Sequence, residues 1–347
     1  MTKKNNDKHN AQIDLFNENL LPEEPQRREN SKFYRKKLKF IDLFCGIGGF
    51  RIALEKKGME CVFSSDIDKH VQDVYYKNFG ERPAGDITQV NEKNIPKHDI
   101  LCAGFPCQTF SISGSRKGMF DSRGKLFYEI IRIAKYHQPI ILLLENVRNI
   151  LTIDHGSVIR TIENELNTIG YKVNKYLLDS SLYGIPQSRK RVYFVCIKRE
   201  YAQDIVSDYP KNLMHQIHLD DVLESNPDRS LFINRNDIII NKHERDIEKD
   251  LKPIKVGIIN KGGQGERIYS PKGHSITLSA FGGGIGAKTG LYHTNLGVRR
   301  LSIDECKKVM GFPISHITTE GSQSYQQLGN AVIPTMIEQV WDNIRGI

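Results

Sequence analysis

The sequence predicts an α/β protein in which a Rossmann-like sheet, with helices on both faces, is joined to a smaller glycine-rich domain. An apolar strand at 40–44 runs into a glycine turn at 45–50 and then into a helical pattern, which is how a Rossmann-like unit opens. The unbroken apolar run 140–144 is typical of a parallel strand buried on both faces. The segment 257–300 has 11 glycines and one acid, Glu266, and so suits a surface that docks phosphates better than a core.

Composition and charge restrict the class of protein. The chain has 347 residues, 39% of them hydrophobic and 26% charged, enough for two soluble domains. Its formal net charge of +9 favours a polyanionic partner. No apolar run is long enough to span a membrane, and no signal-peptide pattern is present. The six cysteines form no C-x-x-C pair, which fits a reducing cytoplasm and argues against a metal site or a disulfide framework.

The first strand, turn and helix predict a crevice for a nucleoside cofactor. The second strand, 61–65, ends at Asp66, which follows Gly46 by 20 residues, close to the spacing at which a carboxylate accepts hydrogen bonds from ribose hydroxyls. The turn reads Gly-x-Gly-Gly, which counts against NAD. Further along, Asp86 either accepts from an adenine amino group or caps the turn that follows it.

A cysteine stands at the end of the third predicted strand. The strand 98–103 runs into Gly104–Gln108, and a polar Ser/Gly loop with positive charge follows at 109–118. Cys107 is therefore predicted to be exposed where it can attack a group arriving from solvent. A buried structural cysteine is the alternative, and the flanking proline and polar loop argue against it.

Charged residues at the ends of later strands complete the candidate site. Glu145 follows the buried strand 140–144, so it should point into the ligand crevice with a raised pKa and act as an acid near neutrality. A helix N-cap is the structural alternative. Arg189 and Arg191 are two residues apart, so on a strand they share a face and need an anion or a lone-pair acceptor nearby.

The remaining segments give weaker signals. Residues 1–31 are polar and are predicted to be disordered or loosely helical. The basic run 32–39 is interpreted as a solvated lead-in to the first strand, in preference to a phosphate contact. Helices are predicted at 125–134, 159–166 and 302–311, with a closing helix of about three turns after 334.

Six blocks, in this order, resemble the DNA cytosine-C5 methyltransferases. They are 42–49, 104–108, 145–147, 187–191, 300–302 and 329–332. The resemblance covers residues 38–347. Asp66 stands where many members have Glu, and Cys45 where many have Ala. Within the family, the stretches 85–93 and 261–270 are most similar to enzymes that act on GCGC.

The resemblance implies a set of functional residues. It implies catalysis by Cys107, Glu145, Arg189 and Arg191. It implies S-adenosylmethionine as cofactor, bound by Phe44, Gly46, Ile47, Gly48, Gly49, Asp66, Ile67, Asp86, Ile87, Pro106, Asn330 and Val332. It implies DNA contacts from Ser111, Ser113, Arg123, Lys255, Gln264, Arg267 and Thr277.

The resemblance also implies a domain arrangement and partners. It divides the chain into an N-terminal extension (1–37), a catalytic domain (38–218 with 325–347), a target-recognition domain (219–302) and a hinge (303–324). It implies a monomeric bacterial cytoplasmic enzyme that binds double-stranded DNA. A cognate restriction endonuclease would act on the same site without contacting it.

Three other functions compete with this interpretation. A catalytically silent DNA-binding relative is disfavoured by the joint presence of Cys107, Glu145, Arg189 and Arg191. A related RNA cytosine methyltransferase typically carries a second proline where this chain has Phe105, and it lacks this kind of recognition segment. A nicotinamide oxidoreductase does not fit the glycine pattern and leaves Cys107 unexplained.

Overall fold

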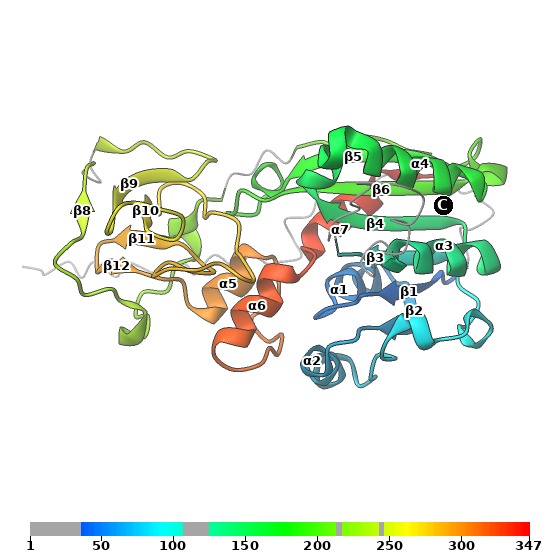
Figure 1. The fold of residues 1–347 in the computed structure, drawn as a ribbon, viewed down its shortest axis with the longest axis horizontal. Helices are drawn as coiled ribbons and strands as arrows, with labels where there is room; N and C mark the ends of the chain where they lie inside the picture. Colours follow the sequence, from blue (N-terminus) through cyan, green and yellow to red (C-terminus); the bar gives the residue numbers. More distant parts are fainter. Residues whose placement is uncertain (1–35, 107–124, 213–216, 243–245) are drawn as a thin grey trace, which may run out of the picture.

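The computed structural model describes residues 36–106, 125–212, 217–242 and 246–347. Over these residues the chain forms two large sheets and one two-stranded sheet, and two short helices lie between the large sheets (Figure 1). The predicted α/β class, with a mixed sheet and helices, is confirmed. No helix in this part of the chain is both long and apolar enough to cross a membrane.

The larger sheet has, within the described residues, six strands in the order β2-β1-β3-β4-β6-β5. The strands are β1 (Lys39–Leu43), β2 (Glu60–Ser65), β3 (Ile100–Gly104), β4 (Ile141–Val147), β5 (Tyr171–Asp179) and β6 (Lys190–Lys198). The pairs that join β1, β2, β3 and β4 are parallel, whereas β6 is antiparallel to both of its neighbours. The carboxyl ends of β1 to β4 therefore meet at one edge, where α/β proteins bind ligands.

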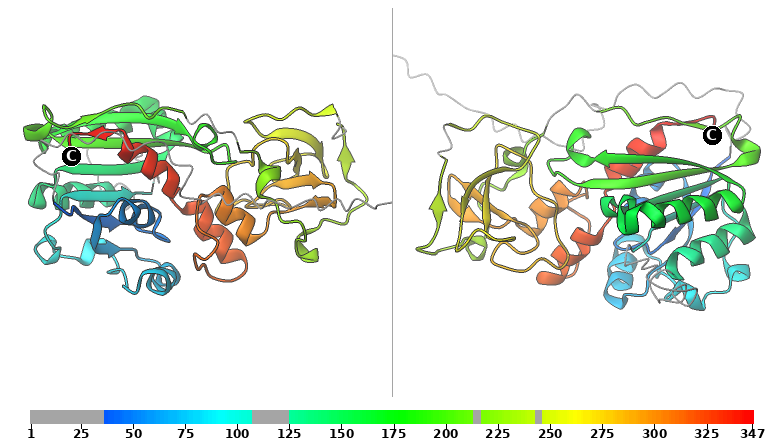
Figure 2. Two further views of the ribbon diagram at one scale, coloured as in Figure 1. Left: turned by 180° about the vertical axis from the view of Figure 1, so that it is seen from behind. Right: turned by 45° about the horizontal axis from the view of Figure 1, so that its top comes forward.

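Helices cover both faces of this sheet (Figure 2). α1 (Gly49–Lys56) and α7 (Pro334–Asp342) lie on one face, and α3 (Lys125–His137) and α4 (Ser157–Thr168) lie on the other. Side chains of β4 alternate between the two layers: Ile141 and Leu143 pack with the first pair, and Leu142 and Leu144 with the second. This alternation explains the unbroken apolar run in the sequence, because both faces of the strand are buried.

The smaller sheet has, in the described part of the chain, five strands in the order β12-β11-β10-β9-β8. The strands are β8 (Ile239–Ile240), β9 (Ile254–Ile258), β10 (Arg267–Ser270), β11 (Leu291–Thr294) and β12 (Gly297–Arg299). Val256, Ile268 and Leu291 form its small core. Two short strands, β7 (Val206–Ser207) and β13 (Ile344–Arg345), form an antiparallel pair. This pair joins the C-terminal end of the chain to the segment that follows β6.

α5 (Ile303–Val309) and α6 (Ser322–Asn330) lie between the two sheets (Figure 1). A backbone seam also joins the two parts, because Ser188 N–H donates to Ser275 O (3.0 Å) and Ser275 N–H donates to Pro186 O (2.9 Å). Close by, the Thr277 hydroxyl donates to Ser188 O (2.6 Å). The smaller sheet is thus fixed against the loop that enters β6.

Two helices were not predicted from the sequence. α2 (Lys69–Phe79) begins at Asp68, whose carboxylate accepts from the backbone of His70 and Val71, and ends at Gly80 in a left-handed conformation. α6 contains glycine, serine and asparagine, which are weak helix formers, so its composition did not predict a helix. α7 has nine residues and is slightly shorter than the predicted three turns.

Candidate active site

A pocket of about 540 Å³ lies at the carboxyl edge of β1 to β4. Twelve of the predicted functional residues line it: Phe44, Gly46, Ile47, Asp66, Ile67, Asp86, Ile87, Pro106, Glu145, Arg189, Arg191 and Asn330. They come from segments far apart in the sequence. The structure therefore brings nine of the twelve predicted cofactor residues and three of the four predicted catalytic residues to one crevice.

The glycine turn between β1 and α1 forms one end of the crevice. Its backbone is left-handed at Gly46 (φ 53°) and Gly48 (φ 88°), so non-glycine residues would be strained there. Gly49 abuts Val332, whose carbonyl oxygen would lie 2.1 Å from a Cβ at position 49. Gly48, Gly49 and Val332 do not line the pocket, so their contribution in this structure is packing beneath the turn.

The two predicted cofactor carboxylates already have backbone partners. Asp66 accepts from the N–H of Gly46 (2.9 Å) and from the N–H of Asp68 (3.0 Å). Burial raises its pKa, which these two hydrogen bonds oppose. Asp86 accepts hydrogen bonds from the N–H and the hydroxyl of Thr88. It therefore caps the turn that follows it, which is one of the two roles predicted for this residue. Each carboxylate can accept further hydrogen bonds, because it has about four lone-pair positions.

Glu145 is buried near the end of β4, beside an arginine from β6. Its Oε1 lies 3.0 Å from Nε of Arg191. Burial raises the pKa of Glu145, and the charges of Arg191 and Arg189 lower it. The predicted raised pKa of this acid is therefore present, with desolvation as its main cause.

Arg189 lies deeper than Arg191. Its Nη2 donates to the carbonyls of Gly329 (3.1 Å) and Ala331 (3.0 Å), and its buried Nη1 has no partner within the described residues. Burial, together with the charge of Arg191, lowers its pKa to about 9. The predicted need of these arginines for acceptors is met by Glu145 and by two backbone carbonyls.

Asn146 is a site residue for which no role was predicted from the sequence. It is 1% exposed, and its Nδ2 donates to Phe105 O (2.9 Å), while its Oδ1 accepts from Val147 N–H (2.8 Å). Asn146 thereby joins the ends of β3 and β4, next to Pro106. The only feature of the sequence that pointed to Asn146 was its position in 145–147, one of the six blocks described above.

Four predicted residues lie outside the described part of the chain: Cys107, Ser111, Ser113 and Arg123. Pro106 is the last described residue after β3, and it lines the crevice. In the parallel pair of β3 and β4, Gly104 is the register partner of Glu145. Cys107 is thus three residues beyond a position adjacent to Glu145.

The predicted DNA-contacting residues of the smaller sheet do not line this pocket. Lys255 lies on β9, Arg267 begins β10, and Gln264 lies in the loop between these strands; all three are exposed. That loop contacts a second glycine-rich loop, since a Cβ at Gly265 would lie 2.4 Å from Gly283 O. Thr277 forms the seam described above.

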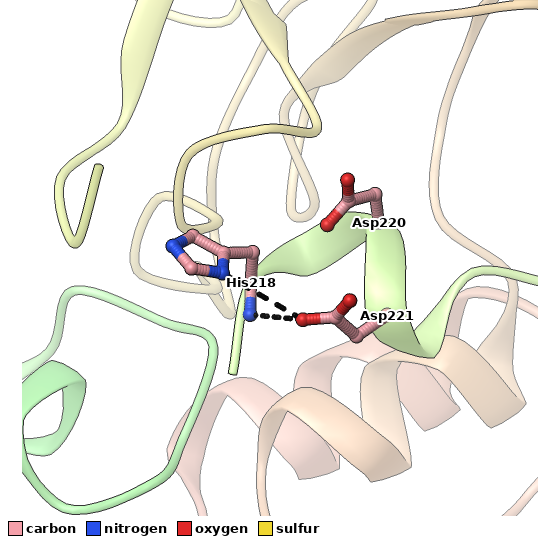
Figure 3. A group of neighbouring side chains, drawn as sticks. All are labelled: His218, Asp220 and Asp221. Carbon is pink, nitrogen blue, oxygen red and sulfur yellow. Dashed lines mark hydrogen bonds and ion pairs between the residues drawn. The ribbon is translucent and has the colours of Figure 1, made fainter. Parts of the chain in front are cut away.

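A cluster with metal-ligand spacing lies elsewhere, at His218, Asp220 and Asp221 (Figure 3). Asp221 accepts from the backbone N–H of His218 (2.7 Å), as a helix cap does. Lys249 Nζ lies 3.1 Å from Asp220 and 3.4 Å from Asp221, so one ammonium group already offsets part of the charge of these carboxylates. These contacts explain the cluster without an ion.

Comparison with known proteins places this chain among methyltransferases. The family model for C-5 cytosine-specific DNA methylase matches residues 38–346. The chain is 47% identical over 311 residues to the type II methyltransferase M.HhaI of Haemophilus parahaemolyticus, covering 88% of this chain and 94% of that protein. It is 38% identical over 347 residues to the type II methyltransferase M.MspI of a Moraxella species, covering 99% and 79%.

Solved structures share the fold. The Entamoeba histolytica methyltransferase EhMeth aligns with a TM-score of 0.69 at 21% identity, covering 89% of this chain and 98% of that one. The S. pombe Dnmt2 methyltransferase aligns with a TM-score of 0.66 at 19% identity, covering 88% and 97%.

The fold is therefore that of a methyltransferase. The chain belongs to the C-5 cytosine-specific DNA methylase family and is a DNA cytosine-5 methyltransferase. The family and the enzyme class predicted from the six sequence blocks are confirmed.

Proposed function

We propose that this enzyme methylates C5 of a cytosine in double-stranded DNA through a covalent bond between Cys107 and C6 of the base. The observation that carries the proposal is Glu145, buried at the carboxyl edge of the sheet with a raised pKa and paired with Arg191. An acid of this kind suits proton donation to a base placed in the crevice. The strand beside it leads directly to Cys107.

The chemistry explains why these residue types occur together. C5 of cytosine is a weak nucleophile until the Cys107 thiolate adds to C6 and the C5–C6 π electrons move to C5. After C5 takes up the methyl group, N3 returns its proton to Glu145 and solvent water takes the proton from C5. The C5–H electron pair then re-forms the C5–C6 double bond, and the electron pair of the sulfur–C6 bond leaves with sulfur, which regenerates the thiolate. Glu145 donates to N3 during the addition, and Arg191 binds O2. Positive charge near the thiol also favours the thiolate, which matters because a free thiol has a pKa of about 8.5.

The crevice suits S-adenosylmethionine. Its volume of about 540 Å³ is in the range of small-molecule pockets, about 300–1,000 Å³. Ile67 is 71% exposed beside Asp66, which provides an apolar surface for a flat base next to an acceptor for ribose hydroxyls. Asp86 and Ile87 would hold the other side of the adenosine, and Asn330 the amino-acid part. When bound, this cofactor supplies an electrophilic methyl group on sulfur.

We further propose that the target base leaves the DNA helix, because C5 and C6 are inaccessible in stacked duplex. The segment 108–124 would close over it, with Ser111, Ser113 and Arg123 contacting DNA. The region 219–302 would form the target-recognition domain, between the catalytic domain (38–218 with 325–347) and the hinge (303–324).

The proposed target is GCGC, methylated at its 5′ cytosine, as the modification half of a restriction-modification system. The 47% identity to M.HhaI and the similarity in 261–270 support this proposal. Arg267 matches the O6 and N7 acceptors of guanine, Gln264 would fill the space left by the base, and Lys255 and Thr277 would contact the backbone. The enzyme would act as a monomer in the bacterial cytoplasm, without contacting its endonuclease.

Two measurements test this function. The first compares methyl transfer by the wild type and by Cys107→Ser on duplex DNA and on tRNA; we expect transfer to duplex DNA by the wild type and none by the variant. The second is bisulfite sequencing of DNA from a host that expresses the enzyme. Methyl groups at a motif other than GCGC would exclude the specificity but not the chemistry, whereas wild-type turnover by Cys107→Ser would exclude the covalent route.

A further inference from the structure

Four amide side chains of α6 line the crevice, Gln327 among them, and the other three, Gln323, Gln326 and Asn330, share one face of the helix. Their spacing of three and four residues places them on the same side of the helix. Within the described residues, no hydrogen bond involves any of these three amides. Gln327 differs, because its Oε1 accepts from the backbone and the hydroxyl of Thr319 (both 3.2 Å). Gln323, Gln326 and Asn330 are therefore available to a ligand, whereas Gln327, which also lines the crevice, is held by Thr319.

The row of amides leads from the larger sheet towards the smaller one. At the C-terminal end of α6, Arg189 donates to Gly329 O (3.1 Å). At its N-terminal end, Lys288 donates to Ser322 O (2.8 Å). With a rise of about 1.5 Å per residue, Gln323 lies about 10 Å beyond Asn330 along the helix axis.

An exposed aromatic ring lies beside this row. Phe281 is 77% exposed and lines the same pocket. The residue before it, Ala280, packs on α6, since a Cβ at Gly329 would lie 2.8 Å from Ala280 N. An exposed aromatic ring next to unpaired amides is a surface that suits nucleic acid, because rings stack on bases and amides bind the backbone.

We propose that Gln323 and Gln326 bind the sugar–phosphate backbone of the DNA strand that carries the target cytosine, next to the nucleotide in the crevice. This inference rests on the proposed function and specifies a DNA contact within it. DNA that reaches both Glu145 and the smaller sheet has to pass α6, which lies between the sheets (Figure 1). Amide N–H groups donate to phosphate and sugar oxygens without adding charge.

The cofactor does not account for the same two residues. The predicted cofactor residues run from Asp66 and Asp86 across the glycine turn to Asn330, which ends the row at the sheet. Gln326 and Gln323 lie one and two turns farther along α6, away from that sheet. Gln323 follows Ser322, whose carbonyl accepts from Lys288 of the segment between β10 and β11 (2.8 Å).

The test is the double substitution Gln323→Ala with Gln326→Ala, assayed on a GCGC-containing duplex. Loss of two neutral hydrogen bonds should raise KM for DNA by about tenfold. The dissociation constant for S-adenosylmethionine should stay within about twofold of the wild type. The slope of log K for DNA against log salt should be unchanged, because no charge is removed. Gln203→Ala, in an exposed turn outside the pocket, is the matched control and should leave KM unchanged.

A second variant tests the contact in the opposite direction. Gln326→Lys places an ammonium group at the same position, so DNA binding should tighten and the slope of log K against log salt should steepen by about one. An unchanged KM in the double variant, or a loss of cofactor affinity in its place, overturns the inference. If the wild type does not methylate duplex DNA at all, it is the proposed function that fails.

Discussion

At the scale of single residues, Asp42 is a buried acid beneath the glycine turn. It is 0% exposed, and neither carboxylate oxygen has a hydrogen-bond partner within the described residues. Burial raises its pKa well above the ordinary value; Arg51 lowers it, and Asp66 raises it further. The folded protein therefore retains a proton on Asp42 that the unfolded chain, with a pKa of about 3.9, has released.

This proton makes the stability of the protein depend on pH. As pH rises from about 4 towards the raised pKa of Asp42, the wild type loses stability, at about 1.4 kcal/mol for each pKa unit. Asp42→Asn does not titrate, so its melting temperature relative to the wild type should increase between pH 5 and pH 8. The measurement is thermal unfolding of both proteins at each pH, and a difference that does not vary with pH would contradict the assignment.

Glu145 should give the methylation rate a pH dependence of its own. Because burial raises its pKa, a larger fraction is protonated near neutrality than for an ordinary carboxyl group. The single-turnover rate should fall as pH rises through the raised pKa of Glu145, because the proton donor is then lost. Glu145→Gln should be slower by about 10²–10⁴ and should lack the decline at high pH. A decline that persists in this variant would assign it to another group.

The sequence predicted the positions of the site residues better than their partners. Asp66 and Glu145 could be found because each follows a parallel strand, and the carboxyl ends of such strands meet at one edge. Asp86 was predicted with two possible roles, and the structure shows its capping contact with Thr88. The hydrogen bond from Asn146 to Phe105 joins residues 41 apart in sequence, so no local pattern could reveal it.

At the scale of elements, α5 begins at a fully buried ion pair. Glu305 accepts from Arg299 through both oxygens (2.7 and 2.8 Å), from Glu224 N–H (2.7 Å) and from Ser302 N–H (2.8 Å). Glu305 is 0% exposed and Arg299 1% exposed. All of the acceptor positions of this carboxylate are used.

Two substitutions at this helix start should differ in severity. Glu305→Ala leaves Arg299 charged and buried, and removal of one partner of a buried pair destabilises a protein by about 3–5 kcal/mol. Ser302→Ala removes the N-cap, which is worth about 1 kcal/mol, and the hydrogen bond of the hydroxyl to the part-buried Glu224 (2.8 Å), and it leaves no buried charge without a partner. Urea denaturation would measure both. Equal losses would mean that the buried pair contributes no more than the cap.

Elements with strong periodicity were predicted, and those that depend on tertiary packing were not. The strands of the larger sheet and the helices α1, α3 and α4 have apolar residues at the expected spacing. α6 shows few apolar residues, and it is held at its ends by Arg189 and Lys288, from other parts of the chain. Those contacts exist only in the folded protein.

At the scale of the whole molecule, the net charge of +9 should make DNA binding strongly salt-dependent. Lys255 is exposed on β9 of the smaller sheet, where the proposed DNA contacts lie. Lys255→Ala should weaken binding by a similar factor on GCGC and unrelated duplexes and reduce the slope of log K against log salt by about one. The check is fluorescence anisotropy over a range of salt concentrations. A slope that matches the wild type would exclude a phosphate contact at Lys255.

The carboxylate of Glu305 also marks where the chain enters and leaves its second sheet. Glu224 lies on the way in and Arg299 on the way out, and both contact this one side chain. The segment between 224 and 299 therefore starts and finishes at the same side chain. A segment of different length and base preference could be grafted between these two positions if it kept the contacts of Ser275 and Thr277 with the loop that enters β6. Such exchange would let one catalytic framework acquire new target sequences.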